Sequence, residues 1–272
     1  MSANGTVVVT DLDGTLWADD LVVRPRTRAA VAELLEAGVR VLVATARRPR
    51  GARELLRENG LELPIVGLNG ALGRHVDWSP FHDAVFGRDA GLAAFAAFAR
   101  HGFMPCVYVA EADVDVVLAP DPSTNPGHVE YLQPVSRVDG DLEGVVRAEP
   151  VYGFSLLGLP PAELEPVVAD LEAAGIAHDF APEPQWTGWS VNAMPPGVSK
   201  WSGIESFCAA VGVTTGDVLA VGDGTNDIQM LERAARPFTV VGSRAAALVP
   251  DAPQIEPPER DGWAALAALV LR

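Results

Sequence analysis

The stretch that decides the fold is TVVVT at residues 6–10, followed directly by DLDGT at residues 11–15. A continuous β-branched run of this kind is typical of a strand that is buried on both faces of a parallel sheet. Polar residues begin where the run ends, and open parallel sheets bind ligands at the carboxyl ends of their strands. The stretch therefore predicts a buried strand that presents Asp11 and Asp13 at the ligand-binding edge of a sheet.

Strand-like and helix-like segments alternate outward from this stretch. On its C-terminal side we expect helices at residues 25–37 and 50–59, and strands at residues 39–44 and 64–68. The same rhythm returns near the end of the chain, with expected strands at residues 218–221 and 238–241 and an expected closing helix at residues 263–271. Such alternation predicts right-handed βαβ units in a parallel sheet.

The middle of the chain interrupts this rhythm. Residues 81–189 contain expected helices at 89–100 and 161–174 separated by several short β-like stretches. We therefore predict an α/β protein in which residues 1–80 and 190–272 form a Rossmann-like parallel-sheet core. Residues 81–189 are predicted to form an inserted α/β cap domain.

Composition narrows the possible partners. The net charge of −16 argues against a nucleic-acid partner, whose phosphates it would repel. No apolar run approaches the roughly 20 residues that a membrane helix needs, and residues 1–9 lack the apolar region of a secretory signal. The two cysteines form no CxxC pair. We expect a cytoplasmic protein without nucleic-acid or membrane partners, present as a monomer or a homodimer.

Several polar side chains share the predicted sheet edge. Asp11, Asp13, Thr45 and Asp223 each fall at or just past the end of an expected buried strand. Clustered carboxylates repel each other unless a cation lies between them, and oxygen ligands beside a phosphate favour Mg²⁺. Lys200 is the only lysine among the 20 basic residues, which indicates a position where a compact ammonium is needed. The site is suited to a metal ion and a phosphate group.

These motifs resemble those of a known family. Residues 11–15 resemble the first motif of the haloacid dehalogenase superfamily, and Thr45, Lys200 and GDGTND at residues 222–227 are similar to its second, third and fourth motifs. The position of the insertion, together with NGA at residues 69–71, resembles the Cof-type phosphatases, which carry a type IIB cap.

The resemblance implies a mechanism. Asp11 is implied to be the nucleophile that forms an aspartyl-phosphate, and Asp13 to protonate the leaving oxygen and then activate water. Mg²⁺ is implied to be bound by Asp11, the Asp13 backbone carbonyl and Asp223. Asp227 is implied either to support the metal or to orient Lys200. The implied reaction is hydrolysis of phosphate monoesters of small, sugar-phosphate-like metabolites.

The phosphate contacts follow from the same resemblance. Thr45 and Lys200 are implied to bind the phosphoryl oxygens. Ala46 and Arg47 are further candidates, although the second motif often reads Thr-Gly-Arg and alanine tolerates a positive φ poorly. Asn226 is either a phosphate contact or only the cap of a helix that starts near it.

Other readings of the same residues remain open. A phosphosugar mutase or phosphotransferase could use the same aspartyl-phosphate, provided that it excludes water. A non-catalytic phosphometabolite sensor would be expected to lack Asp11 or Asp13, and both are present. The segment 81–189 holds 17 acidic and 4 basic residues, so we expect neutral or cationic leaving groups to be preferred.

Overall fold

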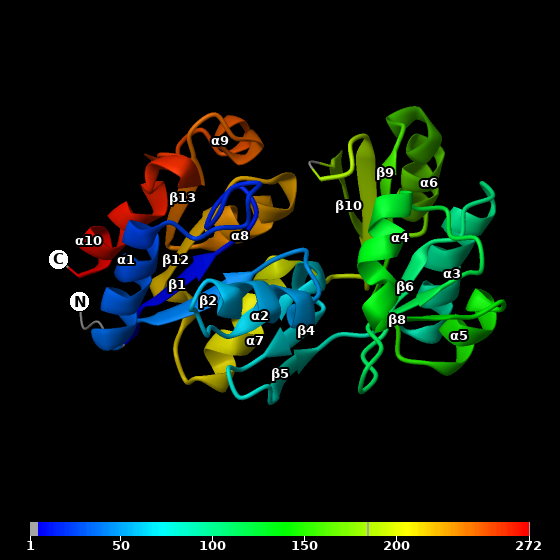
Figure 1. Cartoon of the computed structure of the whole chain (residues 1–272), viewed down its shortest axis with the longest axis horizontal. Helices are drawn as coiled ribbons and strands as arrows, with labels where there is room; N and C mark the ends of the chain where they lie inside the picture. Colours follow the sequence, from blue (N-terminus) through cyan, green and yellow to red (C-terminus); the bar gives the residue numbers. More distant parts are fainter. Residues whose placement is uncertain (1–4, 184, 272) are drawn as a thin grey trace. The chain divides into compact units, whose positions relative to one another are not determined.

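The computed structural model describes residues 5–183 and 185–271. The chain divides into two compact units, one made of the chain up to Asp83 and from Ser199 onward, the other of Ala84–Val198 (Figure 1). Residues 1–4, which begin the segment in which we expected no secretory signal, lie outside the described residues.

The borders of the insertion differ from the predicted residues 81 and 189, and strand pairing explains why. Strand β5 (Pro80–Asp83) pairs antiparallel with β4 (Leu72–Arg74) and so belongs to the core sheet. At the other border, β11 (Trp189–Met194) pairs with β9 (Gly153–Leu159) and belongs to the inserted unit. Strand pairing therefore assigns β5 to the core unit and β11 to the inserted unit.

The core unit contains an eight-stranded sheet in the order β14-β13-β12-β1-β2-β3-β4-β5. Neighbouring strands from β14 to β3 are parallel, whereas β4 and β5 are antiparallel to their neighbours. The remaining strands of this sheet are β1 (Val7–Thr10), β2 (Arg40–Ala44), β3 (Ile65–Gly67), β12 (Val218–Gly222), β13 (Arg236–Val240) and β14 (Gln254–Ile255). The predicted α/β class with a parallel-sheet core is confirmed.

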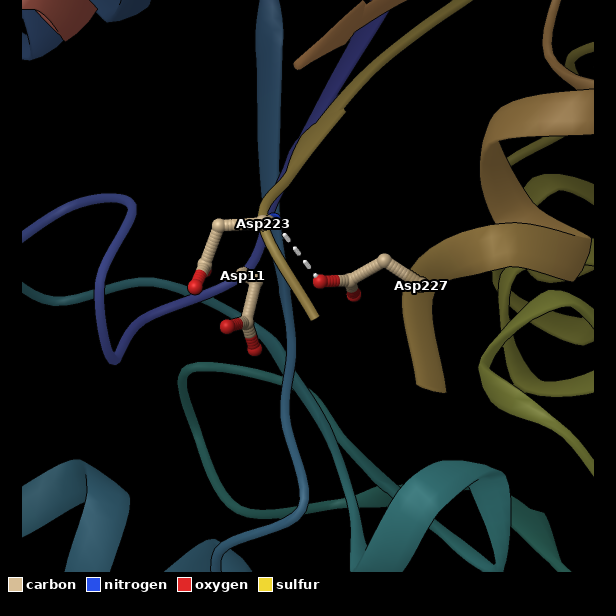
Figure 2. A group of neighbouring side chains, drawn as sticks. All are labelled: Asp11, Asp223 and Asp227. Carbon is tan, nitrogen blue, oxygen red and sulfur yellow. Dashed lines mark hydrogen bonds between the residues drawn. The ribbon is translucent and has the colours of Figure 1, made fainter. Parts of the chain in front are cut away.

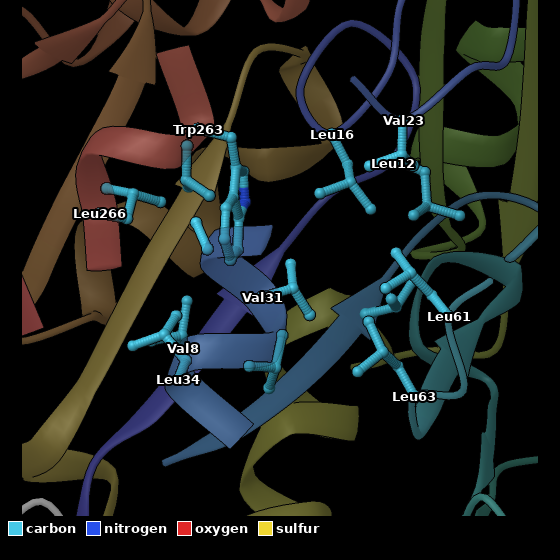
Figure 3. Packing of buried hydrophobic residues seen from close by; sticks show 14 of the residues in the cluster. Val8, Leu12, Leu16, Val23, Val31, Leu34, Leu61, Leu63, Trp263 and Leu266 are labelled. Atoms are coloured by element: carbon cyan, nitrogen blue, oxygen red, sulfur yellow. The ribbon is translucent and has the colours of Figure 1, made fainter. Parts of the chain in front are cut away.

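Helices cover both faces of the core sheet. Successive residues of a strand point to opposite sides, so an all-apolar strand gives the sheet two apolar faces to bury. Val8 of β1 packs into one hydrophobic cluster, shown in Figure 3, with Val31, Leu34 and Trp263. This face carries helices α1 (Pro25–Glu36), α2 (Pro49–Glu58) and α10 (Ala265–Val270). Val7 and Val9 pack on the other face, which carries α7 (Lys200–Ala210), α8 (Ile228–Arg233) and α9 (Arg244–Leu248). The β-branched run is buried on both sides, as its composition indicated.

The inserted unit has its own sheet and its own core. Its six strands lie in the order β10-β11-β9-β6-β7-β8, and every neighbouring pair is antiparallel except β7 and β8. The further elements of this unit are β6 (Cys106–Tyr108), β7 (Val116–Leu118), β8 (Ser136–Val138), β10 (Ala177–Pro182), α3 (Arg88–Ala99), α4 (Pro126–Leu132), α5 (Leu142–Ala148) and α6 (Pro161–Ala173). Phe98, Phe154 and Leu164 lie in its hydrophobic core.

Short 3₁₀ turns complete the chain at Leu68–Gly70, Gln133–Val135, Thr215–Asp217, Thr225–Asp227, Pro258–Arg260 and Gly262–Ala264. Among the described residues, none of the helices has the length and apolar character needed to cross a membrane.

Candidate active site

Two adjacent strands, β1 and β12, bring the candidate carboxylates together. Asp11 follows β1 and Asp223 follows β12, and these two strands pair in parallel register. Asp227 ends the 3₁₀ turn Thr225–Asp227, which continues into α8. Figure 2 shows Asp11, Asp223 and Asp227 grouped at this edge, and one carboxylate oxygen from each lies within 4.8 Å of the others. The parallel sheet therefore converts distant sequence positions into one acidic group.

Lys200 lies inside this group as its internal cation. Its Nζ donates hydrogen bonds of 2.7 Å to Asp11 Oδ1 and of 2.7 Å to Asp227 Oδ1, and its side chain is 0% exposed. Although burial alone would lower the pKa of Lys200, the charges of Asp11 and Asp227 raise it above its usual range. The ammonium therefore stays charged and fixes one oxygen of each carboxylate.

Gly70 allows Lys200 to reach this position. Gly70 has φ 113°, and a Cβ there would lie 1.9 Å from the carbonyl oxygen of Ser199, the residue before Lys200. No side chain fits at that distance. The glycine of the segment 69–71 thus permits the start of α7 to approach the end of β3.

Asp227 organises the group around it. Its Oδ1 accepts from Lys200, and its Oδ2 accepts from the backbone N–H groups of Asp223, at 3.0 Å, and Gly224, at 2.9 Å (Figure 2 draws the Asp223 bond). Asp227 thus connects Lys200 with the backbone of Asp223 and Gly224. The backbone bonds also hold the segment that carries the Asp223 side chain.

Asp223 keeps one oxygen open. Thr15 donates through its hydroxyl to Asp223 Oδ1 at 2.6 Å, and no hydrogen bond reaches Oδ2 from the described residues. A Cβ at Gly14, which has φ 78°, would lie 2.4 Å from that Oδ2. Glycine at position 14 therefore allows the turn after β1 to lie directly against the Asp223 carboxylate. Burial, followed by the charge of Asp227, raises the pKa of Asp223 to about 7.

The same crowding acts on Asp11. Burial raises the pKa of Asp11 well above its usual range, the carboxylates of Asp227 and Asp223 add to the rise, and Lys200 opposes it. Its Oδ2, like that of Asp223, accepts no hydrogen bond from the described residues. The open Oδ2 of Asp223 and the lone pair of Asp11 Oδ1 that Lys200 does not use are donors that fit a hard divalent cation.

Asp13 has a different environment. Its side chain is 39% exposed, and Arg47 donates to it through two parallel hydrogen bonds of 2.7 Å, from Nε to Oδ2 and from Nη2 to Oδ1. The indole Nε1 of Trp17 donates to the same Oδ1 at 2.9 Å. Arg47, a candidate phosphate contact, is thus paired with the candidate acid and base.

The remaining candidates lie on the loop after β2 and near the end of β3. Thr45 is buried, and its hydroxyl accepts from the backbone N–H of Arg47 at 3.2 Å. Ala46 is not among the described residues with positive φ, so the departure from Thr-Gly-Arg causes no backbone strain. Asn226 donates through Nδ2 to Asn69 Oδ1 at 2.9 Å.

The alternative interpretation of Asn226 as a helix cap is wrong. Residues 225–227 form a 3₁₀ turn, α8 begins at Ile228, and neither Thr225 nor Asn226 caps it. The Asp227 carboxylate instead accepts the free N–H groups at this turn, because it is the residue that points back toward them.

Two other residues near the site were missed by the sequence analysis. Asn69 is buried with φ 51°, and its N–H donates to the Thr45 carbonyl at 3.1 Å. Trp17 contacts Asp13 from four residues further along the chain. The sequence analysis named Asn69 only as part of the NGA segment and gave it no role in the site. No sequence pattern pointed to Trp17.

Comparison with known proteins agrees with this geometry. The profile of the haloacid dehalogenase-like hydrolases matches residues 8–247. YkrA of Bacillus subtilis (strain 168) is 26% identical over 226 residues, covering 82% of this chain and 80% of YkrA. A phosphoglycolate phosphatase of Methanopyrus kandleri is 24% identical over 238 residues, covering 84% of this chain and 81% of that protein.

A solved structure shares the fold. The subclass IIB sugar phosphatase BT4131 superposes with a TM-score of 0.75 at 18% identity, covering 97% of this chain and 98% of BT4131. The chain therefore belongs to the haloacid dehalogenase-like hydrolases, as its four motifs indicated, and is an enzyme of their Cof-type phosphatase group, as the position of the insertion and the segment 69–71 indicated.

Proposed function

We propose that this protein hydrolyses phosphate monoesters of small, sugar-phosphate-like metabolites through an aspartyl-phosphate on Asp11, with Mg²⁺ as its cofactor. The observation that carries the proposal is the state of the Asp11 carboxylate. Lys200 holds Oδ1 at 2.7 Å, which leaves Oδ2 as the oxygen for attack on phosphorus. A buried nucleophile with one anchored and one open oxygen is well placed for phosphoryl transfer.

Asp11, Asp223 and the backbone carbonyl of Asp13 are the groups that would hold the cation. The clustering of carboxylate oxygens within 4.8 Å and the raised pKa of Asp223, to about 7, support this assignment. A bound Mg²⁺ would offset carboxylate repulsion and the negative charge of the phosphoryl oxygens. Asp227 would act through Lys200 and the backbone of Asp223 rather than as a direct ligand.

The chain's own residues would carry out the two half-reactions. In the first, an oxygen of Asp11 forms a bond to phosphorus, the ester P–O bond breaks, and its electron pair stays on the leaving oxygen, which takes a proton from Asp13. In the second, Asp13 accepts a proton from water as that water attacks phosphorus, and the acyl-phosphate bond between Asp11 and phosphorus breaks with its electron pair returning to the carboxylate. Inorganic phosphate is released and Asp11 is restored.

Phosphate binding is assigned to the cations and donors around Asp11. Lys200 is buried and charged, and Thr45 follows the strand next to β1. The loop residues Ala46 and Arg47, and Asn226 opposite Asn69, would complete the contacts. Charge on the phosphoryl oxygens is stabilised best by groups that are already fixed in place, as Lys200 is.

The comparisons support the substrate class. The Methanopyrus kandleri relative is named for phosphoglycolate, and BT4131 is described as a sugar phosphatase. Both names refer to small phosphorylated compounds, which the proposal extends to this chain.

The direct test is a screen of phosphorylated metabolites in the presence of MgCl₂, with released phosphate as the readout. We expect hydrolysis that stops with EDTA and is lost in Asp11→Asn. Release of phosphate to water, without transfer to an added sugar, separates a phosphatase from a mutase or a phosphotransferase. Full activity in EDTA, or wild-type activity of Asp11→Asn, would contradict the proposal.

A further inference from the structure

Trp17 contacts the candidate acid and base directly, and nothing in the family motifs explains it. We propose that Trp17 is a positioning residue that fixes Asp13 Oδ1, so that Oδ2 is the oxygen that exchanges protons with the leaving group and with water. The inference rests on the proposed function, because it assumes that Asp13 is the acid and base. The hydrogen bond from Trp17 Nε1 to Asp13 Oδ1, at 2.9 Å, carries it.

The indole is held rigidly. Trp17 is 0% exposed and belongs to the hydrophobic cluster between the core sheet and its helices. Its backbone closes the turn after β1, because Trp17 N donates to the Leu12 carbonyl at 3.1 Å and its own carbonyl accepts from Gly14 N at 2.9 Å. The donor therefore comes from the same turn as Asp13 and cannot move independently of it.

A carboxyl group needs such an external anchor. The terminal torsion of an aspartate side chain is broad, so its two oxygens are not distinguished by the rotamer alone. An indole N–H can only donate, and it can donate to Oδ1 whether or not Oδ2 carries a proton. The Trp17 bond is thus compatible with both half-reactions and selects the same working oxygen in each.

Arg47 differs from Trp17 in this respect. Its Nη2 shares Asp13 Oδ1 with Trp17 at 2.7 Å, but its Nε donates to Oδ2 at 2.7 Å, the position from which a proton must be given to the leaving oxygen. A guanidinium has no acceptor, so its Nε cannot hold Oδ2 in that position while Oδ2 transfers a proton. Arg47 must release Oδ2 during the reaction, whereas the bond to Trp17 can persist. The two donors therefore have separate roles, one displaceable and one fixed.

The test is Trp17→Phe, which keeps an aromatic ring in the core and removes the N–H. The ratio of kcat/KM for two substrates is the readout, with p-nitrophenyl phosphate as the ester of an acidic phenol and glycerol 2-phosphate as an alkyl ester. An alkoxide leaving group requires a proton from Asp13, and a nitrophenolate does not. Because kcat/KM covers only the steps through departure of the leaving group, the second half-reaction does not obscure the comparison.

Trp263→Phe is the matched control. Trp263 is also 0% exposed, lies in the same cluster, and donates through Nε1 to Thr10 Oγ1 at 2.9 Å rather than to Asp13. Thr10 in turn donates to the Asp11 carbonyl, so this variant should lower kcat/KM for both substrates by a similar factor. Similar losses of kcat/KM on both substrates are what a general loss of core packing, or a misplaced nucleophile, would produce.

We expect Trp17→Phe to lower kcat/KM for glycerol 2-phosphate by roughly tenfold or more, while p-nitrophenyl phosphate changes less than about threefold, since a hydrogen bond to a charged group is lost. Equal losses on both substrates in Trp17→Phe, with a selective loss in Asp13→Asn, would overturn the inference and leave the proposed function intact. No selective loss in Asp13→Asn would overturn both.

A second measurement covers the case in which Trp17→Phe does not fold. In wild-type protein with ¹⁵N-labelled tryptophan, one of the six indole N–H resonances should move on Asp13→Asn. If none of the six moves, the contact does not exist in solution and the inference fails.

Discussion

Asp223 links the proposed metal site to the stability of the protein, and its pKa gives the size of the effect. The pKa of this carboxyl rises from 3.8 to about 7 on folding because of burial and the charge of Asp227. A rise of about 3 units corresponds to about 4 kcal/mol, at about 1.4 kcal/mol per unit. This is the order of the extra free energy needed to ionise Asp223 in the folded protein compared with the unfolded chain.

The direction of the pH dependence follows from the raised pKa. A carboxyl that binds its proton more tightly when folded stabilises the folded protein while it is protonated. The contribution is complete below pH 3.8 and is lost as the pH rises to about 7. Mg²⁺ binds the ionised form, so its stabilising effect should increase over the same pH range.

The assay is thermal unfolding from pH 5 to 8.5, in EDTA and in MgCl₂, for wild type and Asp223→Asn. Asparagine keeps an acceptor for the Thr15 hydroxyl, which donates at 2.6 Å, and removes the charge. In EDTA at pH 8 the variant should unfold at a higher temperature than wild type, by roughly 8–16 °C at about 2–4 °C per kcal/mol. Mg²⁺ should raise the wild-type midpoint more at pH 8 than at pH 5, and the variant's midpoint little at either.

Asp251→Asn is the control, because Asp251 is exposed and lies away from the site at the end of the segment before β14. Its unfolding midpoint should match that of wild type at pH 5 and at pH 8, both in EDTA and in MgCl₂. The reasoning is refuted if the Mg²⁺ effect does not depend on pH, or if Asp223→Asn keeps the full effect.

Three further predictions concern the cation, the glycine beside it and the inserted unit. Lys200→Arg should lower kcat/KM by roughly a hundredfold or more, because a planar guanidinium does not fit where one ammonium lies 2.7 Å from both Asp11 and Asp227; equal values for the two enzymes would show that the charge alone matters. Gly70→Ala should lower the free energy of unfolding by about 2 kcal/mol or more, since its Cβ would overlap the Ser199 carbonyl, and a denaturant titration that shows no change would contradict this contact. Bisphosphates should be poorer substrates than neutral sugar monophosphates, because Arg100, Arg137 and Arg147 are already paired with carboxylates inside the inserted unit; a bisphosphate preference that persists at raised salt would refute it.

The parallel core could be predicted because its signal is local. The β-branched composition of the run before Asp11 indicates a strand buried on both faces, and this can be seen without knowing which elements pack against it. The expected strands at residues 39–44 and 218–221 overlap β2 and β12 closely. Strand ends in a parallel sheet meet at one edge, so the grouping of Asp11 with Asp223 followed from topology alone.

The inserted unit was harder to predict. Helices α4 and α5 each have seven residues, too few for a helical period to stand out, and we expected neither. The borders of the unit depend on which strand pairs with which, a choice that a single strand's sequence does not encode.

The hydrogen-bond partners of side chains near the site could not be predicted from the sequence either. The Trp17 bond to Asp13 and the Asn226 bond to Asn69 depend on how turns place donors in space. The motif residues themselves could be named, but which donors reach the oxygens of Asp13 and Asp227 required coordinates. The hydrogen bonds of Asp227 support the proposal that it orients Lys200 and the backbone of Asp223.

The central claim is that Asp11 carries the phosphoryl group during turnover, and acid-quench labelling tests it most directly. Asp13→Asn, which should slow hydrolysis of the intermediate, is mixed with ³²P-labelled p-nitrophenyl phosphate and MgCl₂, quenched in acid and digested. The account predicts label on the peptide that contains Asp11, released by hydroxylamine as expected for an acyl phosphate, and none when Asp11→Asn is added to the same variant. Turnover without protein-bound label, or label that persists in the Asp11→Asn variant, would contradict it.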